Sequence, residues 1–253
     1  MSSCIAVLTR GYSNVSEYDK LIKRNLQIQK NLHNKSIDIL IFHEGNITGE
    51  HQAYIINKTP CLEIHFINVN NGLAFRSNKS QIEVDPGTSF FGIGYRHMCS
   101  FWFVDFWHFV EKYDRILRID EDCFIDFNVD TMLDKLDKHN FICGKWMQDH
   151  NFVTIGMNKM SLDFIKQYNV SSGRMPSGPY TNVFAINLKG IRTNKKLTGY
   201  IKTVDTSDNI YRYRWGDLPL WGEVIYYIFG MESVLVDPNI KYYHESHGAM
   251  VNS

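Results

Sequence analysis

The sequence predicts an α/β protein built on an open, mostly parallel sheet. Short apolar runs alternate with amphipathic stretches through the first 145 residues, at intervals typical of strands connected by helices. The chain has 253 residues, of which 44% are hydrophobic and 21% are charged, so it can bury a sizeable core. Because ligands of such sheets bind at the carboxyl ends of the strands, the polar residues that follow strands are the candidates for chemistry.

The elements follow in chain order. Apolar runs predict strands at 5–8, 37–42, 61–67, 115–119, 141–144 and 233–236. Apolar residues at helical spacing predict helices at 17–32, 93–113 and 130–138, and the aromatic content of the second indicates that it is buried. The segment 68–92 is rich in Asn, Gly and Ser and contains Asp85-Pro-Gly87, which predicts a long loop.

Charge and cysteine content exclude several classes of protein. The 27 Lys and Arg residues balance the 27 Asp and Glu residues, which argues against a long nucleic acid as partner. The five cysteines form no CxxC pair, so we expect neither a zinc cage nor a disulfide framework. The start of the chain does not resemble a signal peptide, and no apolar run is long enough to span a bilayer. We therefore expect a cytoplasmic protein without an integral membrane segment.

The most informative local feature is an apolar strand that leads directly into Asp120-Glu-Asp122. Asp120 and Asp122 would project on the same side if the extended backbone continued beyond the strand. Two carboxylates on a strand end suit Mn²⁺ or Mg²⁺, with a diphosphate as a further ligand. The alternative is a solvated turn or a helix cap.

Two further clusters lie near the end of the chain. Arg214-Trp-Gly-Asp217 precedes Pro219 and an aromatic, helix-like stretch at 220–229. This string predicts either a polar pocket with a stacking wall or an Arg–Asp ion pair that caps the helix. The aromatic residues that would stack on sugar rings are Trp215, Trp221, Tyr211 and Tyr213. His244 and His247 follow the last predicted strand and are either ligands or surface residues.

Together these strings resemble glycosyltransferase family 15, the yeast-type α-1,2-mannosyltransferases. The resemblance rests on Gly94-Tyr-Arg-His-Met-Cys99, the acidic strand end and Arg214-Trp-Gly-Asp217, in that order and at similar intervals. It covers most of the chain, from Val7-Leu-Thr-Arg10 to Tyr243-His244.

The resemblance implies a single GT-A-like domain over 1–253, with a nucleotide-sugar-binding half at 1–125 and an acceptor-binding half at 126–253. It implies a retaining, metal-dependent transfer of a hexose onto a hydroxyl of a glycan or glycoconjugate. The expected donor is GDP-mannose, with a UDP-sugar as the alternative, and the expected cofactor is Mn²⁺ or Mg²⁺.

The candidate site residues combine this resemblance with the reading of the charges. The expected metal ligands are Asp120, Asp122 and His244. The expected donor-binding residues are Arg10, Tyr95, Arg96, Asp120 and Arg214. The expected catalytic residues are Asp217 and Glu223. Structural alternatives are an internal ion pair for Arg96, a packed helix face for Tyr95 and a solvent-facing position for Glu223.

The sequence departs from the family where the family has an acidic residue, proposed as nucleophile, in an Asn-Phe-Glu-Ile string. Phe184 occupies that position in Thr181-Asn-Val-Phe184, and Met147-Gln-Asp149 stands near another family Glu. A double displacement would therefore need Asp217 or Glu223, whereas attack by the acceptor on the same face needs no missing group. An inactive module that binds nucleotide-sugar or glycan is the alternative function. A nucleotidyl- or phosphotransferase is disfavoured, because the chain has no glycine-rich phosphate loop.

Overall fold

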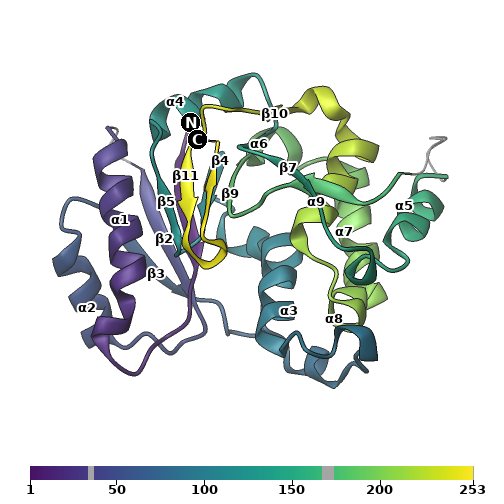
Figure 1. The fold of residues 1–253 in the computed structure, drawn as a ribbon, viewed down its shortest axis with the longest axis horizontal. Coiled ribbons are helices and arrows are strands. Elements are labelled where there is room, and N and C mark those ends of the chain that lie inside the picture. The colour runs from purple at the N-terminus through teal and green to yellow at the C-terminus, as the bar shows by residue number, and fades with distance from the viewer. Residues whose placement is uncertain (34–36, 167–173, 253) are drawn as a thin grey trace.

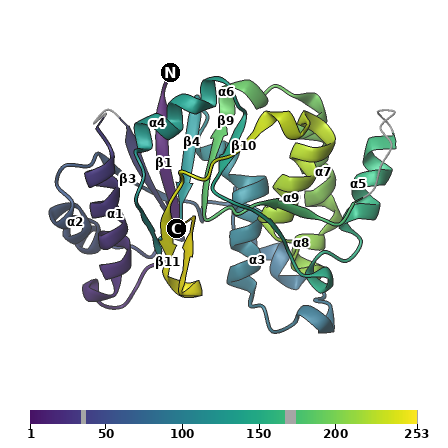
Figure 2. The same cartoon turned by 45° about the horizontal axis from the view of Figure 1, so that its top comes forward.

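A seven-stranded sheet forms the centre of the fold in the computed structural model, which describes residues 1–33, 37–166 and 174–252 (Figures 1 and 2). The strand order is β10-β6-β9-β4-β1-β2-β3. The strands are β1 (Ser3–Leu8), β2 (Asp38–His43), β3 (Ile64–Asn68), β4 (Arg115–Ile119), β6 (Phe141–Cys143), β9 (Val183–Asn187) and β10 (Val234–Val236). All neighbours pair in parallel except β9, which is antiparallel to both β4 and β6. The α/β class with a mostly parallel sheet is confirmed.

Helices cover the sheet in two groups (Figure 1). On one side of the molecule lie α1 (Asp19–Asn31) and α2 (Gly49–Lys58), close to β2 and β3. On the other side lie α3 (Ile93–Ser100), α5 (Met157–Lys166), α7 (Lys195–Ser207), α8 (Asn209–Tyr213) and α9 (Asp217–Val224). Two short helices are α4 (Val129–Asp134), between β5 and β6 in the sequence, and α6 (Leu188–Ile191), directly after β9.

The central strands are buried because both of their faces carry apolar side chains. One face packs Phe42 and Ile116 with the aromatic residues that follow α3 and with Trp221 of α9, and the other packs Ile5 and Leu117 with α4. Four of the five cysteines are buried as free thiols and only Cys61 is exposed. This agrees with cysteines that act as small core residues.

Two small sheets accompany the central one, and the first of them contains the C-terminal strands. β5 (Cys123–Ile125), β11 (Tyr242–His244) and β12 (Ala249–Val251) form an antiparallel sheet in the order β12-β11-β5. β7 (Trp146–Gln148) and β8 (Ser177–Pro179) form a separate pair. Because β11 pairs with β5, His244 lies opposite Cys123 and beside the acidic strand end.

Several expected elements differ in detail. The helix expected over 93–113 ends as α3 at Ser100 and continues as a π-helical turn and a 3-10 turn up to Phe109. The expected loop at 68–92 contains two 3-10 turns, Ser77–Gln81 and Pro86–Thr88. Within the described residues, no helix is both long and apolar enough to cross a membrane.

Candidate active site

The acidic strand end is a turn and not a continued strand. β4 ends at Ile119, and the Cys123 amide donates to the Asp120 carbonyl at 3.1 Å as the chain reverses into β5. Asp120 and Asp122 were expected to project on the same side if the extended backbone continued, and it does not continue beyond Ile119. Both still line one pocket, while Glu121 turns away and accepts a hydrogen bond from Tyr12 at 2.9 Å.

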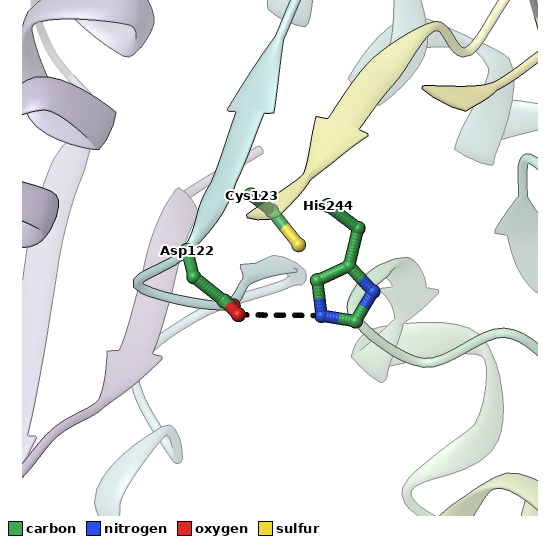
Figure 3. A group of neighbouring side chains, drawn as sticks. All are labelled: Asp122, Cys123 and His244. Atoms are coloured by element: carbon green, nitrogen blue, oxygen red, sulfur yellow. Dashed lines mark ion pairs between the residues drawn. The ribbon is translucent and has the colours of Figure 1, made fainter. Parts of the chain in front are cut away.

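Asp122 and His244 face each other across the small sheet (Figure 3). The Asp122 Oδ2–His244 Nε2 distance is 3.4 Å, and the Ser246 amide donates to the same carboxylate oxygen at 3.3 Å. Burial alone would raise the pKa of Asp122, but the hydrogen bonds from His244 and Ser246 outweigh it and hold the pKa well below its usual range. Asp122 is therefore a carboxylate at neutral pH.

These two side chains could hold a divalent cation. A carboxylate oxygen and an imidazole nitrogen both suit Mn²⁺, and Figure 3 shows the two groups converging beside the Cys123 sulfur. Ligand atoms of Asp122, Cys123 and His244 lie within 4.8 Å of one another. Burial, followed by the charges of Asp120 and Asp122, raises the pKa of the Cys123 thiol well above its usual range, so the thiol is a weaker candidate than the other two.

Asp120 is engaged by other side chains of the protein. It accepts hydrogen bonds from Arg118 Nε at 2.7 Å, Arg118 Nη2 at 3.0 Å and Asn182 Nδ2 at 3.0 Å. The third guanidinium nitrogen, Nη1, donates to Asp217 Oδ2 at 2.5 Å. Burial would lower the pKa of Arg118, but the two aspartate charges outweigh it and raise that pKa. Arg118 thus bridges a predicted metal ligand and a predicted catalytic residue.

Arg214 forms a second bridge in the wall of the same pocket. Its Nη1 donates to Asp149 Oδ2 at 2.8 Å and its Nη2 to the Tyr95 hydroxyl at 2.6 Å. The guanidinium also lies over the rings of Phe91 and Tyr95, at 4.5 and 4.7 Å. Arg214 adopts a left-handed conformation with φ of +62°, which is unfavourable for a residue with a side chain and is maintained by these contacts.

One pocket of about 580 Å³ collects most of the predicted site residues. The residues that line it include Tyr95, Asp120, Asp122, Arg214, Asp217 and His244. Segments that are far apart in the sequence form it: the turn after β4, the start of α3, the N-terminus of α9 and the end of β11. The pocket therefore lies at the carboxyl end of β4, as expected for an α/β sheet.

Three predicted site residues do not line this pocket. Arg10 is exposed at the end of β1 and lies over the Tyr12 ring at 5.1 Å. Arg96 is buried and donates to the carbonyls of Thr88 and Tyr211, both at 2.6 Å, so its role there is structural.

Glu223, the third, is 1% exposed and neither faces solvent nor reaches the pocket. It forms an ion pair with Arg174 at 3.3 Å, and burial raises its pKa. Its position follows from the packing of α9 on β8, where a Cβ on the neighbouring Gly222 would meet the Ser177 carbonyl oxygen at 1.7 Å.

The aromatic residues expected to stack on sugars belong largely to the core. Trp215, Trp221 and Tyr211 are at most 3% exposed, and the two indole N–H groups donate to the carbonyls of Ile155 and Trp102. The aromatic rings that do line the pocket include Phe91 and Tyr95.

The structure adds residues that sequence reasoning missed. Beyond Arg118, these are Asp149, Tyr180 and Asn182; His247, for which the sequence left a ligand and a surface residue open, also lines the pocket. Tyr180-Thr-Asn182 leads into β9 and so lies beside the end of β4, with which β9 pairs. The available signal was therefore a polar string next to an apolar run, but β9 itself was not among the predicted strands.

Phe184 belongs to the core. It is 2% exposed and contacts Phe141 and Trp221, with ring centroids 6.2 and 5.7 Å away. No carboxylate therefore replaces the missing one at this position of β9.

Solved structures with a similar fold include glycosyltransferases. No family model matches the sequence, and no curated protein matches it either.

Three structures illustrate the similarity. The mannosyltransferase Ktr4p from S. cerevisiae superposes with a TM-score of 0.78 at 16% identity, over 96% of this chain and 70% of that one. The Mn/GDP form of Core-mannan synthase A (CmsA/Ktr4) from Aspergillus fumigatus gives 0.77 at 14% identity, over 96% and 74%. Mouse xyloside xylosyltransferase 1 gives 0.55 at 13% identity, over 94% and 85%. At these identities the likeness shows the fold, and the GT-A-like fold implied by the resemblance is confirmed.

Proposed function

We propose that the protein is a metal-dependent glycosyltransferase that transfers a hexose, with retention of configuration, from a nucleoside diphosphate sugar to a hydroxyl of a glycan or glycoconjugate. GDP-mannose is the donor that we favour, with a UDP-sugar as the alternative. Two of the structures with this fold are mannosyltransferases or mannan synthases, one of them in an Mn/GDP form, which supports this choice.

The observation that carries the proposal is the meeting of Asp122 and His244. These residues are 122 positions apart in the sequence, yet their side-chain atoms lie 3.4 Å apart on the wall of the pocket of about 580 Å³. Mn²⁺ bound there would act as a Lewis acid that stabilises the charge developing on the departing diphosphate. Asp122 would hold the cation through a carboxylate oxygen and His244 through Nε2.

The protein's own charges support such a reaction at the other end of the pocket. Arg118 and Arg214 place two fixed positive charges on the pocket wall, each compensated by aspartates. Asp217 lies at the first position of α9 and is only 5% exposed, so its carboxylate has a fixed orientation. Asp217 would orient the sugar or the acceptor hydroxyl. We expect the donor on the 1–125 half and the acceptor on the 126–253 half.

The mechanism that we favour is attack by the acceptor on the same face of the sugar. Double displacement requires a carboxylate at the anomeric carbon, and Phe184 and Glu223 both lie in the interior. The remaining candidate, Asp217, is bound to Arg118 at 2.5 Å, which weakens it as a nucleophile. In same-face attack, the departing phosphate accepts the proton of the acceptor hydroxyl.

The same observations favour a second candidate function, an inactive module that binds nucleotide-sugar or glycan. This alternative is supported by the core position of Phe184 together with the ion pairs of Asp217 and Asp120. Such a module would retain metal-dependent binding without turnover.

Calorimetric titration with GDP and UDP, each with and without Mn²⁺, tests the proposal. We expect Mn²⁺-dependent binding of GDP, followed by transfer or slow hydrolysis of GDP-mannose. Preference for UDP would replace the donor, and binding without turnover would favour the inactive module. Absence of binding to either nucleotide would refute the proposed function.

A further inference from the structure

Tyr180 lies between two histidines beside the proposed cation site. Its hydroxyl oxygen is 2.7 Å from His244 Nδ1 and 2.6 Å from His247 Nδ1. The two imidazole rings are close, with centroids 4.2 Å apart. His244 is 3% exposed, whereas His247 follows β11 in an exposed turn. The three side chains therefore form one hydrogen-bonded chain from a buried ring to an exposed ring.

The number of protons restricts this chain. A tyrosine hydroxyl has one proton, and a neutral imidazole carries one N–H and one bare nitrogen. When Tyr180 donates to one histidine, it accepts from the Nδ1–H of the other. If His244 carries its proton on Nδ1, His247 carries its own on Nε2. In the reverse arrangement His244 carries its proton on Nε2 and His247 on Nδ1.

The other nitrogen of His244 selects between the two arrangements. Figure 3 shows that the ring turns one nitrogen toward Asp122 and the other away from it. Nε2 is 3.4 Å from Asp122 Oδ2, and this carboxylate favours a proton on Nε2. The Ser246 hydroxyl, at 3.0 Å from Nε2, fits either arrangement because it can donate or accept. A cation at this position requires a bare Nε2, because a ligating imidazole nitrogen carries no proton.

We propose that Tyr180 is a positioning residue that couples His244 to His247, so that occupation of the Asp122–His244 site changes the tautomer of both histidines. The inference rests on the proposed function for the cation, but the hydrogen-bonded chain does not. His244 changes from Nε2–H to Nδ1–H, and His247 changes from Nδ1–H to Nε2–H.

The proton transfers balance without net release. The Nδ1 proton of His247 passes to the Tyr180 oxygen, and the hydroxyl proton of Tyr180 passes to His244 Nδ1. The Nε2 proton of His244 leaves to water, and water protonates Nε2 of His247. His247 thus responds to a cation that it does not bind, through Tyr180.

The tautomers can be read directly by NMR of the ¹⁵N-labelled full chain at pH 8, where unperturbed imidazoles are neutral. Zn²⁺ is a suitable probe because it is diamagnetic and binds imidazole and carboxylate. Without Zn²⁺ we expect His244 as Nε2–H and His247 as Nδ1–H, and with Zn²⁺ both assignments exchange. In Tyr180→Phe the His247 signals no longer respond. A wild-type His247 that does not respond while His244 binds Zn²⁺ overturns the inference.

Zn²⁺ affinity, measured by chelator competition, provides a second readout. Partners that orient a metal-bound histidine are worth about 10- to 100-fold in affinity, so we expect Tyr180→Phe and His247→Ala to weaken binding about tenfold. His247→Asn restores a hydrogen-bond acceptor near the Nδ1 position and should rescue the affinity. Tyr243→Phe is the matched control, because Tyr243 lies next to His244 on β11 but its ring faces Phe124. Equal losses in His247→Asn and His247→Ala contradict the coupling.

Failure of the proposed metal site and failure of the tautomer coupling give different results. If neither histidine responds to Zn²⁺, the proposed metal site is refuted. The cation-free spectrum still tests the hydrogen-bonded chain of His244, Tyr180 and His247. If both histidines were protonated on Nε2, only one of the two contacts with Tyr180 would contain a proton. That result would overturn the inference whether or not the metal site exists.

Discussion

The two ends of the pocket differ in how their carboxylates are compensated by positive charge. At the cation end, formed by Asp122, His244, Tyr180 and His247, one carboxylate faces an imidazole and no Lys or Arg forms an ion pair with it among the described residues. At the arginine end, Arg118 and Arg214 are paired with Asp120, Asp217 and Asp149. The first end retains a negative charge that a cation can neutralise, whereas the second is already largely compensated by the protein.

This difference indicates a division of roles. Carboxylates bound by buried arginines are costly to separate from them, so the arginine end keeps its geometry whether or not a ligand is bound. The cation end has less internal compensation and gains more from a divalent ion. We therefore expect substitutions at the cation end to change ligand binding, and substitutions at the arginine end to change stability and turnover.

The largest effect is expected for Asp122→Ala. Removing the carboxylate leaves His244 as the main ligand, so Mn²⁺-dependent nucleotide affinity should fall at least about 100-fold while the fold remains intact. Calorimetric titration measures the affinity, and circular dichroism checks the fold. Asp126→Ala, an exposed aspartate at the end of β5, is the control and should bind as the wild type does. Unchanged affinity in Asp122→Ala would remove the metal site from this end of the pocket.

Asp217→Asn should separate binding from turnover. The amide retains a hydrogen bond to Arg118 but loses the charge, so nucleotide affinity should be preserved and kcat should fall about 100-fold. The measurement is transfer from GDP-mannose to a simple mannoside, with affinity determined in parallel. A fully active variant would contradict the assignment of Asp217, and a parallel loss of affinity would place it in donor binding.

Arg118→Met tests whether the arginine end is structural. The substitution leaves Asp120 and Asp217 without their shared partner in a largely buried position, which should lower the free energy of unfolding by about 3 kcal/mol. Arg118→Lys keeps the charge but cannot contact both carboxylates with the same geometry, so its loss should be smaller. Urea unfolding of both variants measures this. An unchanged free energy of unfolding in Arg118→Met would mean that the two aspartates are held by other groups.

The central sheet could be predicted from the sequence better than the site. Strand β4 is buried along its whole length, and its apolar residues Ile116, Leu117 and Ile119 are enough to identify it as a strand. The prediction of β4 at Arg115–Ile119 coincides with the structure, and so does the position of the acidic residues after it. What the periodicity could not show is the turn at Asp120–Asp122, because three residues contain no period.

The approach of His244 to Asp122 was expected from a resemblance and not from local pattern. The responsible strands, β5 and β11, have three residues each, too few for alternation to be recognised. Side-chain partners are a further step beyond strand pairing. Arg118 donates to Asp120 and Arg96 donates to carbonyl groups, and both contacts depend on rotamers and on distant loops. For this reason charged residues near a site are easier to propose than to assign.

The smallest expected effect concerns pH and the carboxylate at the cation end. The pKa of Asp122 is depressed in the folded protein, so ionised Asp122 stabilises the fold above the unfolded-state value of about 4. This contribution is lost as the pH falls through the lower pKa of the folded state, because the folded form then takes up its proton. The difference in unfolding free energy between the wild type and Asp122→Asn should therefore shrink as the pH falls from 7 to 3, by about 1 kcal/mol for a half-buried group. Urea unfolding at several pH values measures it, with Asp126→Asn as the exposed control. A difference that does not depend on pH would mean that the contacts with His244 and Ser246 do not hold the charge, and the contrast between the two ends would then rest on the arginines alone.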